Sequence, residues 1–181
     1  MQITGMLWGR KLLDLVEFTH SEVHGPELSV DEIKNMIKRH GQIFIKPMFK
    51  GGVGKKGKSG LLGRVDNISD ALKEKERLYF CEHVDGFNKV KSDGVTYEGA
   101  VPADYEVYFS ISESTEHRCP IMTITHHGGV DIEELDDDKI KVVPFDALTG
   151  LKAFHVSNAL MELGAPTALI SPLVQNLPKL W

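Results

Sequence analysis

The stretch GGVGKKGKSG, residues 51–60, is compatible with two phosphate-binding designs that require different folds around them. It contains the pattern G-x-x-x-x-G-K-S of a P-loop, in which backbone N–H groups and a lysine hold the phosphates of a nucleotide. A P-loop places that lysine and serine, here Lys58 and Ser59, in the first turn of a helix. Gly60 and Gly63 follow instead, and each glycine costs a helix interior about 0.8–1 kcal/mol relative to alanine. The sequence therefore argues against a P-loop.

The segments on either side favour the second design, a glycine-rich loop between two antiparallel strands. QIFIKP (residues 42–47) is β-branched and aromatic, and LLGRV (residues 61–65) also prefers an extended conformation. The first strand would deliver Lys46 to the edge of the loop, where lysines neutralise phosphate through charge-assisted contacts. Composition alone also allows the loop to be a solvated basic turn without a ligand.

The bulk composition indicates a globular protein with a small anionic ligand. The 181 residues are 41% hydrophobic, enough for a buried core in one domain or two small ones. The net charge of -5 argues against a nucleic-acid partner, whereas residues 46–58 hold five lysines and no acid. Cys81 and Cys119 are too few for a disulfide framework, which fits a reducing compartment. Because no leader and no apolar run of about 18 residues is found, we expect a cytoplasmic protein without a membrane partner.

Periodicity and capping residues predict a chain of mixed helices and strands. The helix after Ser29 has the clearest signals, since Ser29 and Glu32 form a capping-box pattern and Gly41 stops the helix. Helices are expected at residues 9–18, 30–40, 69–75 and 151–163, and from Ser171 onward. Strands are expected at residues 42–47, 61–65, 77–84, 105–114 and 119–129, the last two as a hairpin, with residues 85–104 a long connection.

Six segments in a fixed order resemble the ATP-grasp subunit of the nucleotide-dependent acyl-CoA ligases. That family holds the succinyl-CoA synthetase beta subunits and the amino-terminal part of ATP-citrate lyase, and the agreement of order and spacing covers residues 9–181. The lysine loop and HHGGVD are closer to ATP-citrate lyase and citryl-CoA synthetase, whereas DALTG is closer to succinyl-CoA synthetase. The segments are IFIKP (43–47), KKGKSGLLG (55–63), FCEHV (80–84), YEVYFSI (105–111), THHGGVDIEEL (125–135) and PFDALTG (144–150).

The resemblance implies a nucleotide-binding site with a phosphate end, an adenine end and a ribose contact. A strand lysine and a basic-basic-glycine stretch of the loop would contact phosphates, a hinge strand would meet the adenine edge, and a glutamate would lie beside the nucleotide at the ribose. Without the family, the glutamates would be interpreted as surface carboxylates. The matching residues, in that order, are Lys46; Lys55, Lys56 and Gly57; Glu82, His83, Val84 and Asp85; and Glu106.

The histidine pair and the acidic run do not predict a metal site. No third ligand lies at a zinc-site spacing from His126 and His127, and adjacent strand residues are expected to point to opposite faces. The family more often has glutamate at the position of His127, so the resemblance implies no role for this residue. Gly128 and Gly129 are expected to form a tight turn, and residues 136–138 a solvated one.

The fold that the resemblance implies is α+β, an ATP-grasp fold that is truncated before its metal-binding strands. Residues 1–84 would form an N-terminal helix and a lid-like subdomain with its core at about 41–84, and residues 85–181 a second, incomplete subdomain. The family's Mg²⁺ ligands, an asparagine in an E-I-N-P strand and an aspartate on the next strand, have no counterpart here. They are expected beyond residue 181, and the chain by itself is expected to be inactive.

The function implied is the nucleotide-binding part of an ATP-dependent acyl-CoA-forming enzyme, ATP-citrate lyase or citryl-CoA synthetase. ATP would phosphorylate a histidine of an alpha-like, CoA-binding subunit or domain, the phosphoryl group would pass to citrate, and CoA would displace it. One alternative is the beta subunit of a succinyl-CoA or malate-CoA ligase. Another is an ATP-grasp interaction module without catalysis.

Overall fold

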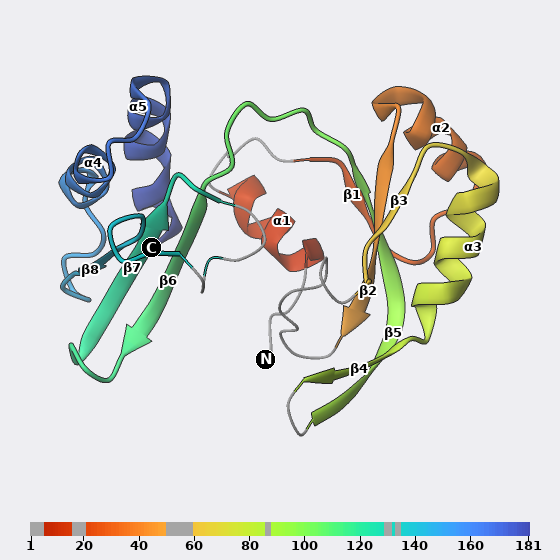
Figure 1. The fold of residues 1–181 in the computed structure, drawn as a ribbon, viewed down its shortest axis with the longest axis horizontal. Coiled ribbons are helices and arrows are strands. Elements are labelled where there is room, and N and C mark those ends of the chain that lie inside the picture. The colour runs from red at the N-terminus through yellow and green to blue at the C-terminus, as the bar shows by residue number, and fades with distance from the viewer. Residues whose placement is uncertain (1–5, 16–20, 50–59, 86–87, 129–131, 133–134) are drawn as a thin grey trace. The chain divides into compact units, whose positions relative to one another are not determined.

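The computed structural model describes residues 6–15, 21–49, 60–85, 88–128, 132 and 135–181. The chain divides into two compact units, Met1–Pro102 and Ala103–Trp181, which are described separately below (Figure 1). Among the described residues, no helix has the length and apolar character needed to span a membrane.

The first unit is built on an antiparallel sheet in which β5 is the central strand. Its elements are α1 (Met6–Leu15), β1 (Val23–His24), α2 (Val30–His40), β2 (Ile43–Phe49), β3 (Gly63–Val65), α3 (Ile68–Tyr79), β4 (Glu82–Asp85) and β5 (Asn88–Gly99). The strand order is β1-β5-β2-β3, and β4 pairs with the opening residues of β5. The pairing of β2 with β3 confirms the two antiparallel strands predicted on either side of the glycine-rich stretch.

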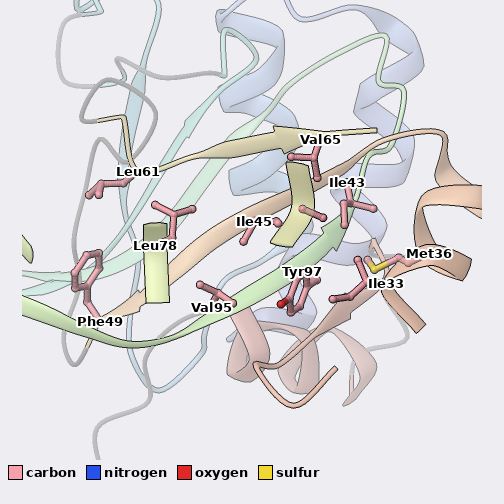
Figure 2. Packing of buried hydrophobic residues seen from close by; sticks show 11 residues of the cluster. Ile33, Met36, Ile43, Ile45, Phe49, Leu61, Val65, Leu78, Val95 and Tyr97 are labelled. Carbon is pink, nitrogen blue, oxygen red and sulfur yellow. The ribbon is translucent and has the colours of Figure 1, made fainter. Parts of the chain in front are cut away.

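Helices α2 and α3 lie on one side of this sheet and cover its apolar face (Figure 1). Ile43 and Ile45 of β2 and Val95 and Tyr97 of β5 are fully buried in that core, and Figure 2 shows Ile43 and Tyr97 near Met36. Because side chains alternate along a strand, the intervening residues of β2 and β5 face away from the helices.

Local sequence signals specify α2 as predicted. The Ser29 hydroxyl accepts a hydrogen bond from the Glu32 backbone N–H at 3.3 Å, and the Ser29 N–H donates to the Glu32 carboxylate at 2.9 Å. This capping box satisfies backbone N–H groups that have no partner inside the helix. Gly41 ends the helix with a φ of 73°, a backbone conformation that suits glycine.

Most of residues 85–104, which were expected to form a long connection, belong to strand β5. Its glycines and aspartates suggested a loop, yet residues 95–98 alternate between the buried core and the opposite face of the sheet. Since β5 pairs with β1, β2 and β4, it belongs to the first unit. The boundary between the units therefore lies at Pro102/Ala103 and not after Val84, where the sequence analysis placed it.

Helix α3 is longer than expected and begins earlier. Asn67 is its N-cap and accepts a hydrogen bond from the Asp70 backbone N–H at 2.9 Å, whereas the helix was expected to begin at Ser69. The helix continues to Tyr79, so the expected strand at residues 77–84 is reduced to β4. Apolar residues near the end of the helix are buried in the core, Leu78 fully, and a short apolar run does not distinguish helix from strand.

In the second unit, one helix packs on a three-stranded antiparallel sheet and the next helix packs against the first. Its elements are β6 (Tyr108–Ser114), β7 (Cys119–Thr125), β8 (Lys141–Pro144), α4 (Ala153–Glu162), α5 (Thr167–Asn176) and a 3-10 helix, η2 (Leu177–Leu180). The predicted hairpin is confirmed, because β6 and β7 pair from Tyr108↔Thr125 to Ser114↔Cys119. Strand β8, which pairs with β7, was not among the predicted strands.

The last helix differs from its prediction in where it begins. Helix α5 starts at Thr167, and Pro172, expected near the helix start, lies in its interior. Trp181, which is about half exposed, contacts Phe145 edge-on at 4.9 Å between ring centroids. A Cβ at Gly150 would lie 2.6 Å from the Trp181 ring, so this position needs glycine for space as well as for its φ of 75°.

Candidate functional site

The face of the first sheet that points away from α2 and α3 carries a set of polar side chains fixed by strand register. Phe44 of β2 lies opposite Glu98 of β5 on one side and Arg64 of β3 on the other. One row further along, Lys46 lies opposite Thr96. Directly opposed residues of an antiparallel pair project to the same face, so these five side chains share one surface, called here the open face.

Lys46 and Glu98 form an ion pair on the open face. The side chain of Lys46 is 25% exposed and that of Glu98 is 14% exposed, so the pair is mostly shielded from solvent. The Ser21 hydroxyl donates a second hydrogen bond to Glu98 Oε1 at 3.0 Å. The Lys46 ammonium also lies 5.9 Å from the centre of the Phe44 ring, within range of a cation–π contact.

A cavity of about 550 Å³ lies beside Phe44, and it is within the range of small-molecule sites. Arg64 Nε and Nη2 donate to Gln42 Oε1 at 2.8 and 2.6 Å, which holds both side chains in place. The lining combines an aromatic ring and apolar side chains with a few hydrogen-bonding groups. The residues that line it are His40, Gly41, Gln42, Phe44, Arg64, Asp66, Ala100, Val101 and Pro102.

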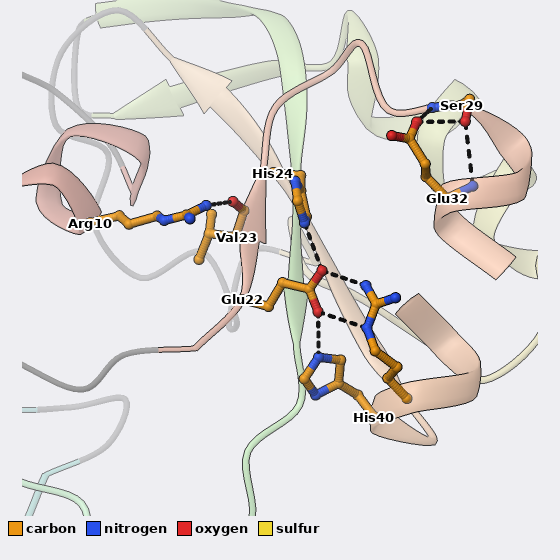
Figure 3. Close-up of polar contacts among 8 residues, drawn as sticks. Arg10, Glu22, Val23, His24, Ser29, Glu32 and His40 are labelled. Atoms are coloured by element: carbon orange, nitrogen blue, oxygen red, sulfur yellow. Dashed lines mark hydrogen bonds and ion pairs between the residues drawn. The ribbon is translucent and has the colours of Figure 1, made fainter. Parts of the chain in front are cut away.

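A cluster around Glu22 joins the segment at β1 to helix α2 (Figure 3). The Glu22 carboxylate accepts hydrogen bonds from Arg39 Nη2 at 2.5 Å and lies 2.7 Å from the Nε2 atoms of His24 and His40. Burial alone would raise the pKa of Glu22, but the hydrogen bonds from Arg39, His24 and His40 lower it to about 2. The Glu22 carbonyl accepts from the Gly99 N–H at 2.9 Å, so this cluster also holds the end of β5.

The three loop residues of the expected site, Lys55, Lys56 and Gly57, lie outside the described residues. The chain on the far side of that segment is described, and it forms strand β3 from Gly63 to Val65. A P-loop requires a helix at this place, so the P-loop pattern in the sequence is coincidental.

The expected hinge residues, Glu82, His83, Val84 and Asp85, form β4. This strand pairs with residues 88–91 of β5, whereas Lys46 pairs with Thr96, so Lys91 and Thr96 are separated by about 17 Å along the strand. The structure therefore does not bring these residues next to Lys46. The Glu82 carboxylate pairs with Lys89 Nζ at 2.6 Å, and this hydrogen bond lowers the pKa of Glu82.

Glu106 lies in the second unit and is exposed. Its carbonyl accepts a hydrogen bond from the backbone N–H of Gly128 at 2.8 Å. The contact joins the segment before β6 to the bend after β7, so Glu106 and Gly128 are neighbours in space.

His126 and His127 follow the end of β7. The expectation that their side chains point to opposite faces was wrong. Their rings lie 4.1 Å apart, because the chain bends after Thr125 and strand alternation no longer applies. His126 Nδ1 is buried without a hydrogen-bond partner among the described residues, and burial followed by the neighbouring His127 lowers the pKa of His126. In the described part of the chain, no three His, Cys, Asp or Glu side chains converge to hold a metal ion.

The residues that sequence reasoning missed are the partners of Lys46 on the open face. Glu98, Phe44 and Arg64 come from three strands, and only the register brings them together. The alternation of Val95, Thr96, Tyr97 and Glu98 was the signal that could have identified β5 and placed Glu98 on the polar side.

Sequence and structure comparisons relate the chain to CoA ligases. No family model matches the sequence. The succinate–CoA ligase [ADP-forming] beta subunit of Desulfatibacillum aliphaticivorans is 28% identical over 162 residues, which cover 86% of this chain and 42% of that subunit. The ADP-forming sulfoacetate–CoA ligase subunit of Bilophila wadsworthia is 32% identical over 114 residues, which cover 61% of this chain and 29% of that subunit.

A solved structure shows the same fold. ATP citrate lyase from Methanothrix soehngenii, in complex with citrate and coenzyme A, superimposes with a TM-score of 0.63 at 20% identity, over 94% of this chain and 39% of that chain. The chain thus spans less than half of the length of each of these relatives. The expected α+β ATP-grasp fold is confirmed by this likeness. These comparisons confirm the expected resemblance to the ATP-grasp subunits that include the beta subunits of succinate–CoA ligase and the corresponding part of ATP citrate lyase.

Proposed function

We propose that this chain binds ATP on the open face and supplies the nucleotide-binding part of an enzyme that joins a small carboxylic acid to CoA. One observation carries the proposal: the Lys46 ammonium lies on the open face, close to the Phe44 ring, on the strand that leads into the glycine-rich stretch. A partly shielded lysine in this position binds phosphate more strongly than a fully exposed one, because water screens the attraction less.

The residues of the first unit fit the two ends of a nucleotide. Lys46 would contact phosphate oxygens, and the cavity beside Phe44 would take the base, whose flat face matches the aromatic ring. ATP supplies the phosphoryl group that activates the acid. The chain's own contribution is to orient the nucleotide and to offset phosphate charge.

The loop residues and Glu106 are part of the same proposal. Lys55, Lys56 and Gly57 belong to the segment that joins β2 to β3, which are adjacent antiparallel strands, and this supports their assignment to the phosphate end. The assignment of Glu106 to the ribose rests on the family resemblance alone. The resemblance also offers residues 82–85 as the adenine edge, which is the alternative to the cavity beside Phe44, because β4 and that cavity lie on opposite sides of Lys46 along β5. Mg²⁺ is proposed to accompany the ATP, and no described cluster of side chains supplies its ligands.

The identity of the acid separates two versions of the proposal. The sequence relatives named as succinate–CoA ligase subunits favour succinate or a similar acid. The fold neighbour that is an ATP citrate lyase, together with the HHGGVD segment, favours citrate. Both versions include an alpha-like partner that binds CoA and carries a phosphorylated histidine.

Nucleotide titration tests the proposal directly. Lys46→Met keeps the aliphatic stem and removes the charge, so we expect the affinity for ATP, measured by isothermal titration calorimetry, to fall about tenfold or more. Lys141→Met is the matched control, because Lys141 also lies on a strand and pairs with a glutamate, Glu162, at 3.0 Å. Equal affinities of wild type and Lys46→Met for ATP would show that Lys46 does not contact the nucleotide.

Two further measurements decide between the alternatives. Mass spectrometry of the CoA thioester formed with the partner subunit present, with citrate or succinate as the acid, identifies the substrate. The interaction-module alternative predicts no catalysis and no rise in melting temperature with ATP. A ligand that binds only the native state raises that temperature, so an ATP-dependent shift excludes this alternative.

A further inference from the structure

We propose that Arg77 is a positioning residue, which fixes the point where the glycine-rich stretch re-enters the first sheet and thereby sets how strongly the protein binds polyphosphate. The inference rests on the proposed use of Lys55 and Lys56 as phosphate contacts. It adds that a side chain of α3, which touches no ligand, determines how well those two lysines are placed.

The guanidinium of Arg77 joins α3 to the chain just before β3. Its Nη1 donates a hydrogen bond to the Gly60 carbonyl at 2.8 Å. Its Nε donates to both carboxylate oxygens of Glu74 at 3.1 Å, and its Nη2 donates to Glu74 Oε2 at 2.6 Å. Because the donors of a guanidinium are fixed in one plane, Glu74 sets the direction in which Nη1 points. Gly60 is therefore held at a defined place beside the helix.

Glu74 is itself fixed by its packing against β3. Gly63 lies directly opposite Ile45, which is buried in the core, so a side chain at position 63 would also project toward the helices. A Cβ at Gly63 would lie 2.6 Å from Glu74 Oε2 and 3.1 Å from Glu74 Cβ. Glu74 thus occupies the space that a side chain at Gly63 would need, and a glycine is required there for this contact.

The position of Glu74 indicates that Arg77 acts through the chain and not by touching the ligand. Glu74 packs at Gly63 on the helix side of the sheet, whereas Lys46 projects from the open face. The guanidinium that Glu74 holds therefore lies away from the proposed phosphate contact of Lys46. Leu61, which follows Gly60, is buried in the core, so the chain is held on both sides of its entry into β3.

The neighbouring ion pair of α3 provides a comparison. Asp70 and Lys73 have the same i,i+3 spacing and lie 3.2 Å apart, but both side chains are more than half exposed. Glu74 is only 26% exposed, and Arg77 also donates to a carbonyl outside the helix. Exposed pairs of this kind contribute little to stability, so the extra contact with Gly60 is what distinguishes Arg77.

The test compares these two cations of α3 in the full chain by isothermal titration calorimetry. Arg77→Met removes the contact with Gly60, and Lys73→Met is the matched control that removes the same charge. We expect Arg77→Met to bind ATP and inorganic tripolyphosphate about threefold to tenfold more weakly than wild type, with no change for adenosine. Lys73→Met should bind all three ligands as wild type does.

Gly63→Ala disturbs the same contact without removing a charge. The new Cβ would displace Glu74 and with it the guanidinium of Arg77, so the affinity for tripolyphosphate should fall here too. Thermal unfolding checks that each variant folds. Wild-type affinity for tripolyphosphate in a folded Gly63→Ala variant would overturn the inference.

A double-mutant cycle shows whether Arg77 acts through the glycine-rich stretch. With Lys55 and Lys56 both replaced by methionine, Arg77→Met should have no further effect on tripolyphosphate affinity, whereas its effect should persist in Lys46→Met. If Arg77→Met binds like Lys73→Met, or if its effect persists without Lys55 and Lys56, the inference is overturned while ATP binding by wild type keeps the proposed function. Weaker tripolyphosphate binding by Arg77→Met, in a protein that binds no nucleotide, supports the inference and overturns the proposed function.

Discussion

Gly128 lies against the backbone of Glu106 so closely that no side chain fits between them. A Cβ on Gly128 would lie 2.6 Å from the carbonyl carbon of Glu106, a distance that requires the backbone to move. We predict that Gly128→Ala lowers the free energy of unfolding by about 1–3 kcal/mol, the usual effect of overpacking. Urea denaturation measures it.

At Gly9, in contrast, we expect alanine to stabilise the protein. Gly9 lies in α1, and nothing would touch a Cβ there, so Gly9→Ala should raise helix stability by about 0.5–1 kcal/mol. A similar loss at both positions would show that Gly128 is not distinguished by its contact with Glu106.

The hydroxyl of Tyr97 is predicted to contribute nothing to stability. The residue is fully buried, its hydroxyl has no hydrogen-bond partner among the described residues, and burial raises the pKa of Tyr97 to about 12, with a smaller effect of Tyr79. Tyr97→Phe should therefore unfold at the same urea concentration or a higher one. Tyr97→Ala, which removes the ring, should lose about 3–5 kcal/mol. A Phe variant as unstable as the Ala variant would contradict this.

The Glu22 cluster predicts a pH dependence of stability. The pKa of Glu22 is about 2 in the folded protein and 4.5 as its ordinary value, so the unfolded chain binds the proton more readily. The stabilisation is complete above pH 4.5 and is lost as the pH falls from 4.5 toward 2. Glu22→Gln should be about 1–2 kcal/mol less stable than wild type at pH 7.

Glu22→Gln also tests whether the pH dependence comes from the Glu22 carboxylate. Because a protonated glutamate resembles glutamine, the difference in unfolding free energy between wild type and Glu22→Gln should shrink as the pH falls through this range. Urea denaturation at pH 7, 4 and 3 measures it. A difference that stays constant with pH would show that the carboxylate charge is not what stabilises the cluster.

Phe44 is predicted to contact the base of the nucleotide. Phe44→Leu keeps an apolar side chain but removes the ring, and loss of stacking should weaken ATP binding roughly fivefold to tenfold. Tripolyphosphate, which has no base, should bind Phe44→Leu and wild type alike. The control is Phe154→Leu on α4, an exposed aromatic residue of the second unit. Equal losses for ATP and tripolyphosphate would place the effect in folding and not in base recognition.

The sequence predicted the features that depend on neighbours in the chain. The capping box at Ser29 and the hairpin of β6 and β7 need only a few consecutive residues, and both were predicted. The strands β5 and β8 were missed because turn-forming residues in and around them outweighed their weak apolar pattern. The partnership of Lys46 with Glu98 could not be predicted, because it depends on which strands pair and in which register.

The strand β5 serves two purposes with consecutive residues. Tyr97 faces the helices and Glu98 the opposite side, so an insertion or deletion of one residue just before them would exchange their positions. The Glu98 carboxylate would then lie in the apolar core, and the Tyr97 ring would lie on the same face as Lys46. A change of one residue in the length of this segment should therefore lower the stability of the first unit.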